Sequence, residues 1–241
     1  MSEKLVTNAI VLRYADYREH DRMLTLFSPE LGAVEALCRG CRRQNSPLLA
    51  AGEHFATGEY VLFRRGDRNT VTECRISDSF YPLREDVERL SHGMYLLELA
   101  GAAVQPEEEN RRLFLFLLKC LAHLAYGEHP PRRVTAVFLM GILSLSGFRP
   151  IVGRCARCGR AIGAEERAFF SVQAGGALCG DCPAPDGEPL AASELLFLRQ
   201  IMQKGLETLS EPGECTDRVF RLLRALAEDR LEVISRVGKM L

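Results

Sequence analysis

The sequence predicts an α+β protein in which a small amino-terminal barrel precedes an all-helical remainder that carries an inserted ribbon. Three observations predict this arrangement. Residues 4–78 form short apolar runs separated by turns, later residues carry apolar positions at helical spacing, and two Cys-x-x-Cys pairs lie between helices. The chain has 241 residues, enough for two modest domains. We expect a first domain over residues 1–80 and a second over residues 81–241, with the ribbon at about 153–184.

The first domain is expected to contain five short strands. Each is a run of β-compatible, mostly apolar residues, and turn-forming residues such as those at 28–32 separate the runs. The number and length of the runs fit a five-stranded oligonucleotide-binding barrel (OB-fold), although the count alone leaves other small barrels open. The expected strands cover residues 6–12, 22–27, 33–38, 55–63 and 69–76.

The second domain is expected to begin with three helices that form one body. Residues 84–104 carry apolar side chains at helical spacing, and Pro106 followed by three acids is typical of a helix start. Residues 113–124 are apolar nearly all round, which predicts a buried helix. A third helix is expected over residues 132–146, with Gly147 as its C-cap.

Two further helices are expected after the ribbon. Residues 183–189 are rich in Pro, Asp and Gly, which predicts a linker. Ser193 is expected to cap the next helix, and Thr216 the last one, whose apolar positions extend to Ile234. Because helices flank the ribbon on both sides, we expect it to clip together two halves of one helical domain.

Two Cys-x-x-Cys pairs predict a metal site. Two thiolates three residues apart on a tight turn can reach one tetrahedral ion, and a second such turn supplies the remaining ligands. The insert between the pairs contains a strand-like run and a Gly-Gly turn, which predicts a hairpin, while Gly159 and Gly180 are expected to supply positive φ angles to the turns. The competing interpretation is two disulfides or unrelated buried thiols. The expected zinc ligands are Cys155, Cys158, Cys179 and Cys182.

Four thiolate ligands leave no open position on the ion, so this zinc would be structural rather than catalytic. Other catalytic signatures are missing from the sequence as well. His92, His123 and His129 have no paired carboxylate or nucleophile pattern, and no phosphate-binding glycine loop or hydrolase motif occurs. We therefore expect no enzymatic activity. Cys38 and Cys41 form another Cys-x-x-Cys pair, but a single pair at a strand end is a weak redox signal.

Charge is concentrated rather than excessive. The formal net charge is -1, so any nucleic-acid surface must be a local patch. Arginine can bind phosphate through two parallel hydrogen bonds. A groove between barrel loops can follow a nucleic-acid backbone. The competing interpretation is that loop arginines are simply solvated. The candidates are Arg39, Arg42 and Arg43 after the third strand, and Arg64, Arg65 and Arg68 in the loop between the last two strands.

Neither a signal peptide nor a membrane span is expected. The first four residues include no apolar run, and the longest apolar stretch, residues 134–145, is roughly half a membrane span. Nine cysteines, an odd number, together with a zinc-type pattern suit a reducing cytoplasm.

Several short segments occur in a characteristic order from the barrel to the ribbon. Apart from the cysteines, no single segment is very specific. The order of the segments together is specific. The segments are residues 10–13, 16–17, 21–22, 24–27, 39–43, 83–86, 95–98, 147–150 and 175–179. Over essentially the whole chain, the sequence resembles the bacterial RecO family of DNA repair and recombination mediators.

The resemblance implies a mediator that binds single- and double-stranded DNA and anneals complementary strands. With the ring-forming partner RecR, such a protein helps load the recombinase RecA onto DNA coated by single-stranded DNA-binding protein, whose acidic tail it recognises. Arg39, Arg42 and Arg43 fall on the family's basic stretch, although Cys41 stands where another small residue is more common. Available cations for the acidic tail are Lys119, Arg132 and Arg133. A cytoplasmic, nucleoid-associated protein is implied.

Two other functions compete with the mediator. A zinc-ribbon regulator would sense metal or thiol oxidation and bind one DNA sequence, so it predicts sequence-selective binding that is lost on metal removal. A nucleic-acid enzyme would show turnover of a DNA substrate.

Overall fold

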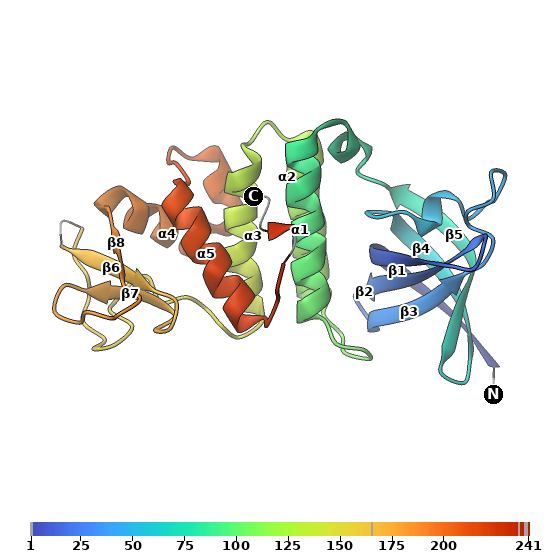
Figure 1. Cartoon of the computed structure of the whole chain (residues 1–241), viewed down its shortest axis with the longest axis horizontal. Helices are drawn as coiled ribbons and strands as arrows, with labels where there is room; N and C mark the ends of the chain where they lie inside the picture. Colours follow the sequence, from blue (N-terminus) through green and yellow to red (C-terminus); the bar gives the residue numbers. More distant parts are fainter. Residues whose placement is uncertain (1, 165, 236, 239–240) are drawn as a thin grey trace. The chain divides into compact units, whose positions relative to one another are not determined.

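The computed structural model describes residues 2–164, 166–235, 237–238 and 241. The chain divides into two compact units, Met1–Tyr126 and Gly127–Leu241. In Figure 1 the first unit comprises the blue-to-green elements up to residue 126, and the second comprises the yellow-green-to-red elements after it.

The first unit begins with a closed five-stranded barrel, which confirms the predicted OB-type fold. The strand order around the barrel is β1-β2-β3-β5-β4, and every pair is antiparallel except β3 with β5. Alternate residues of the strands point into a core of buried apolar side chains. The strands are β1 (Ser2–Tyr17), β2 (Asp21–Ser28), β3 (Gly32–Cys38), β4 (Thr57–Arg65) and β5 (Arg68–Asp78), with a 3-10 turn η1 (Ala50–Gly52) before β4.

Four strands extend beyond the expected runs, and β4 is shifted, since it begins at Thr57 and ends at Arg65. β1 pairs with β4 through its first half and with β2 through its second half, and its register shifts between Val11 and Arg13. β4 and β5 continue until only Gly66 and Asp67 remain between them. The expected loop over residues 64–68 is therefore wrong, because backbone pairing places its three arginines on the strand ends.

The turn between β2 and β3 is bonded to the segment that precedes helix α2 (Arg111–Tyr126). Three backbone hydrogen bonds of 2.9–3.1 Å join residues 29–33 to residues 105–110, and Gly32 forms a β-bridge with Pro106. Glu107 has a φ of +62°, which a right-handed helix excludes. The expected helix start at Pro106 is therefore wrong, because this segment pairs with the barrel and α2 begins at Arg111.

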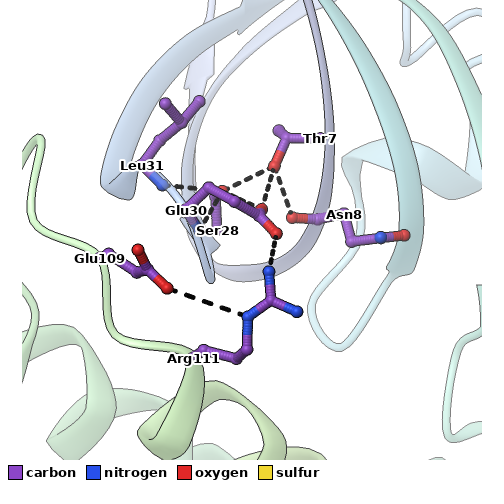
Figure 2. A network of polar contacts seen from close by, with 7 residues as sticks. All are labelled: Thr7, Asn8, Ser28, Glu30, Leu31, Glu109 and Arg111. Atoms are coloured by element: carbon purple, nitrogen blue, oxygen red, sulfur yellow. Dashed lines mark hydrogen bonds and ion pairs between the residues drawn. The ribbon is translucent and has the colours of Figure 1, made fainter.

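A polar network reinforces the same joint (Figure 2). The hydroxyl oxygens of Thr7 and Ser28 lie 2.7 Å apart, and Thr7 donates to one carboxylate oxygen of Glu30 at 3.0 Å. The other oxygen of Glu30 accepts a hydrogen bond from Arg111 at 3.0 Å. One carboxylate thus links two buried hydroxyls of the barrel to the first turn of α2.

Gly32→Ala is expected to destabilise the first unit more than Gly66→Ala does. Both glycines have positive φ, +66° and +58°, so either alanine incurs the left-handed backbone penalty of about 1–2 kcal/mol. A Cβ at Gly32 would lie 2.0 Å from the carbonyl oxygen of Gln105, whereas at Gly66 it would meet no atom within 4 Å. Urea unfolding should show an additional loss of about 2 kcal/mol or more for Gly32→Ala. Equal losses would contradict a tight joint at residue 32.

Two helices complete the first unit. α1 (Val87–Ala103) follows a 3-10 turn, η2 (Tyr81–Glu85), and Asp86 caps it by accepting two backbone hydrogen bonds. Phe27 of the barrel packs edge-on against Phe114 of α2, with ring centroids 5.4 Å apart. The expected three-helix body is therefore divided, because α1 and α2 belong to the unit of the barrel and α3 (Pro131–Leu145) belongs to the second unit.

The second unit combines helices with a small antiparallel sheet of order β7-β6-β8. Gly147 ends α3 as predicted: its φ is +86°, and the next N–H, that of Phe148, donates to the Leu143 carbonyl at 2.8 Å. No helix among the described residues is long and apolar enough to cross a membrane. The elements are α3 (Pro131–Leu145), β6 (Ala168–Ser171), β7 (Gly176–Cys179), β8 (Glu188–Leu190), α4 (Ala192–Lys204), η3 (Gly205–Ser210) and α5 (Asp217–Arg230).

Three expectations for the second unit are wrong in detail. The linker expected over residues 183–189 contributes to β8, which pairs with β6 and extends the hairpin to three strands. α4 starts earlier than a Ser193 cap allows, because the Glu194 carboxylate holds the Ala191 N–H at 2.9 Å. α5 is capped by Thr216 as predicted but ends at Arg230, since the left-handed φ of residue 232 stops the helix.

Candidate metal cluster and nucleic-acid interface

The four predicted cysteine ligands come together in the ribbon. Their Sγ atoms all lie within 4.8 Å of one another, and those of Cys158 and Cys179 are 3.8 Å apart. Cys155 and Cys158 lie in a turn before β6, whereas Cys179 ends β7 and Cys182 follows it. A cluster of this kind can hold one metal ion.

Backbone hydrogen bonds shape the two turns that carry the thiols. The Gly159 N–H donates to the Cys155 carbonyl at 2.9 Å, and the Cys182 N–H donates to the Cys179 carbonyl at 3.0 Å. Gly159 has a φ of +76°, so the prediction of a left-handed glycine in the first turn is confirmed. The corresponding prediction for Gly180 is wrong, because its φ is not positive and a Cβ there would make ordinary contacts.

Donors around the cluster favour the thiolate form of two cysteines. Burial raises the pKa of Cys155, but hydrogen bonds from neighbouring backbone N–H groups lower that pKa to about 6. Burial likewise opposes ionisation of Cys179, and the Arg160 guanidinium is foremost among the groups that lower its pKa. A hydrogen bond with Cys158 and burial raise the pKa of Cys182 to about 12. A cation among the four sulfurs would therefore allow all of them to ionise.

Arg160 is a site residue that the sequence analysis missed. Its guanidinium lowers the pKa of the Cys179 thiol and forms ion pairs with Glu166 at 2.8 Å and Asp181 at 3.1 Å. The two carboxylates hold the guanidinium beside the sulfur. Its position two residues after Cys158 is the signal that could have identified it.

Arginines of the second unit's helices attach the ribbon. Arg199 of α4 donates to the carbonyls of Val152 and Ile162 at 3.0 and 2.6 Å. Arg230 of α5 donates to two carbonyls of the β6–β7 turn at 3.1 and 3.0 Å. The ribbon that carries the cysteine cluster is therefore hydrogen-bonded to both helices that follow it.

The first basic cluster lies beside the turn between β1 and β2, and its three arginines differ in role. Arg42 contributes to the fold: it donates to the Glu19 carbonyl at 3.2 Å and pairs with Asp16 at 3.3 Å. Arg39 and Arg43 are exposed, and neither has an ion-pair partner among the residues that the structure describes. Their charges face solvent.

The second basic cluster sits at the tip of the β4–β5 hairpin. Arg65 and Arg68 are exposed and lie directly opposite each other as partners across the two strands. Arg64 donates to the side-chain oxygen of Asn69 at 3.0 Å, which ties it to the neighbouring strand. Like charges placed opposite each other repel, and a bound polyanion would relieve this repulsion.

The lone Cys-x-x-Cys pair is part of the barrel core. Cys38 and Cys41 are both buried, and burial raises the pKa of each thiol. Buried thiols with raised pKa react poorly as nucleophiles. Their place in the core agrees with a packing role.

The cations considered for an acidic tail are engaged to different degrees. Arg132 pairs with Asp217, and Arg133 donates to the carbonyls of Thr208 and Glu211. Lys119 is exposed on α2.

The fold and the two sites define a class of protein, in which an OB-type barrel with exposed arginines shares a chain with a helical unit that carries a four-cysteine ribbon. Comparison of the chain with models of protein families identifies the family to which it belongs. The model described as "Recombination protein O N terminal" matches residues 1–80, and "Recombination protein O C terminal" matches residues 84–236. The chain belongs to the RecO family of DNA repair proteins, which confirms the resemblance.

Curated proteins of the same family are similar in sequence to this chain over most of its length. A protein of Acetivibrio thermocellus named "DNA repair protein RecO" is 32% identical over 233 residues, which are 95% of this chain and 92% of the relative. Proteins of the same name from Moorella thermoacetica and Alkaliphilus metalliredigens are 33% and 34% identical. These matches cover 76% and 85% of this chain, and 68% and 83% of the two relatives.

Proposed function

We propose that the protein is a recombination mediator that binds single- and double-stranded DNA and anneals complementary strands. With RecR, it would promote loading of RecA onto DNA coated by single-stranded DNA-binding protein. The observation that carries this proposal is the match to both RecO family models, which together span most of the chain. The proposal requires binding without turnover, and it places the protein at the nucleoid in the bacterial cytoplasm.

The barrel arginines would contact DNA through its phosphates, with little preference for sequence. Arg39, Arg43, Arg65 and Arg68 present exposed guanidinium groups for this purpose. Arg42 and Arg64 belong to the same clusters, but their hydrogen bonds tie them to neighbouring backbone or side chains, so they would mainly position the surface. Two complementary strands repel each other, and arginines that neutralise phosphates on both strands would lower this barrier to annealing.

The cysteine cluster would hold one structural zinc ion. A tetrahedral zinc with Zn–S distances of about 2.3 Å separates its sulfurs by about 3.8 Å. The Sγ atoms of Cys158 and Cys179 are already 3.8 Å apart, which supports this ion. Zinc bound by four thiolates supplies no reaction and would fix the two turns of the ribbon.

The partner contacts are proposed for the helical parts of the chain. RecR and the acidic tail of single-stranded DNA-binding protein are the partners that the family membership suggests. Lys119 offers an exposed cation for the acidic tail.

Competition binding tests the mediator against the sequence-specific regulator. A labelled single-stranded oligonucleotide is bound first and is then challenged with unlabelled single strands and duplexes of unrelated sequences. A mediator is expected to release the label to unrelated competitors at similar concentrations. A regulator would prefer one duplex sequence by on the order of 1,000-fold or more, and such a preference would contradict the proposal.

A further inference from the structure

The outer face of β1, β2 and β3 presents a band of small and apolar side chains. The strand register aligns Ala15 with Met23, Met23 with Leu37, and Leu37 with Thr70 of β5. The barrel core is formed by the alternate residues of these strands, including Leu24 and its register partner, Ala36. The band therefore faces away from the core, and each of its four side chains is at least partly exposed.

Tyr17 stands at one end of this band. It lies two residues beyond Ala15 on β1, so both side chains leave the same face of the strand. Tyr17 is 41% exposed. The Arg18 guanidinium lies 5.3 Å from the centre of its ring, which is a cation–π contact. An accessible ring thus lies beside a positive charge.

Positive charge borders the band on both sides. Arg39 follows Leu37 by two residues, and Arg43 lies in the segment just beyond it, on the side of the β1–β2 turn. At the other side, Arg68 precedes Asn69, whose register partner is Ala36 of β3. A strand of nucleic acid laid over the band would meet an arginine on each side.

The acidic groups near the band are engaged within the protein. Asp21, the register partner of Tyr17, accepts a hydrogen bond from the Gly40 N–H at 2.8 Å. Asp16 pairs with Arg22 and Arg42 at 3.2 and 3.3 Å. Glu35 accepts a hydrogen bond from Thr25 and pairs with Arg13 at 3.5 Å. Because Asp16 and Glu35 are paired with arginines, Arg39, Arg43 and Arg68 are exposed cations beside the band with no ion-pair partner among the described residues.

We propose that Tyr17 stacks on a base of single-stranded DNA that lies across the outer face of β1–β2–β3. This inference rests on the proposed function and adds the residue that contacts the bases. Phosphates would lie toward the bordering arginines, and bases would lie over the apolar band with one of them against the Tyr17 ring. Stacking of this kind tolerates any sequence, because every base has a π-face. Duplex DNA, whose bases are already stacked, would not use the tyrosine.

The chain contains no tryptophan, so Tyr17→Trp creates a single indole reporter. Tyr81→Trp is the matched control, since Tyr81 belongs to the same unit, is 62% exposed and lies outside the band. Each full-length variant is titrated with an oligothymidylate of about 15 nucleotides, which is within the range of an OB-fold site. Quenching of the indole by a stacked base is expected for Tyr17→Trp, and little change is expected for Tyr81→Trp.

Affinity provides a second readout. Tyr17→Ala is expected to weaken oligothymidylate binding by about 5- to 100-fold, because base–aromatic stacking contributes on this scale. Tyr17→Phe should retain the affinity of the wild type. Neither change should alter the salt dependence, since tyrosine carries no charge to neutralise phosphate.

The possible outcomes separate this inference from the proposed function. Binding of oligothymidylate without quenching of Tyr17→Trp, or with unchanged affinity of Tyr17→Ala, would overturn the role of Tyr17 alone. Quenching by an acidic peptide but not by oligothymidylate would assign the band to a protein partner and would also overturn it. Failure of the wild-type protein to bind any DNA would overturn the proposed function and the inference together.

Discussion

Cys155→Ala is expected to abolish stoichiometric zinc binding and to unfold the ribbon while the barrel stays folded. The sheet of the ribbon consists of strands of only four, four and three residues, so its apolar contacts are few. Structural zinc contributes about 10–16 kcal/mol in small zinc-binding peptides, as much as the whole stability of a typical domain. A cluster with three thiolates would bind the ion far more weakly. The ribbon should then lose its order.

Zinc content per chain and thermal unfolding measure this effect. Cys215→Ala is the matched control, because Cys215 is buried in the same unit but lies outside the four-cysteine cluster. The control should bind one zinc per chain and lose only the packing of one small side chain. Full zinc content in Cys155→Ala, or the same loss in both variants, would contradict a zinc site at the cluster.

The double variant Arg39→Ala/Arg43→Ala is expected to bind single-stranded DNA more weakly and with a flatter salt dependence. Each phosphate contact on a single strand contributes about 0.7 to the slope of log affinity against log salt. Loss of two contacts should therefore reduce the slope by about 1.4. Fluorescence anisotropy over a series of salt concentrations measures both the affinity and the slope.

A matched variant separates this effect from a general change of charge. Arg112 and Lys119 are exposed on α2 of the same unit, so Arg112→Ala/Lys119→Ala removes the same charge away from the barrel. This control should retain the wild-type slope. Arg42→Ala differs from both double variants. It should lower the free energy of unfolding, because it removes the bonds of Arg42 to Glu19 and Asp16. Equal slopes for the wild type and the Arg39/Arg43 variant would contradict phosphate contact by these residues.

The features that the sequence predicts well are those encoded over short stretches. The two cysteine pairs define a cluster because each pair is held by one tight turn, and the turns are brought together by a single hairpin. The five strands are recognisable for a similar reason, since each apolar run is bounded by turn-forming residues. The caps at Gly147 and Thr216 are equally local.

The features that could not be predicted from the sequence depend on partners far away along the chain. Pro106 with its acids has the composition of a helix start, but the turn near Gly32 captures this segment by backbone pairing. The sequence does not distinguish Arg42 from the neighbouring arginines. Its structural role comes from its bonds to residues 16–19. The sequence does not mark Tyr17 as a candidate binding residue. The register of β1, β2 and β3 does, because it places Tyr17 beside an exposed apolar band.

Annealing of two complementary, unstructured oligonucleotides tests the central claim most directly. The strands would be used bare and coated with single-stranded DNA-binding protein, and duplex formation would be followed by fluorescence for the wild type and the Arg39→Ala/Arg43→Ala variant. The account predicts that the wild type accelerates annealing on bare and coated strands and that the variant loses most of this acceleration. No acceleration by the wild type, or full acceleration by the variant, would contradict a DNA mediator that acts through its barrel.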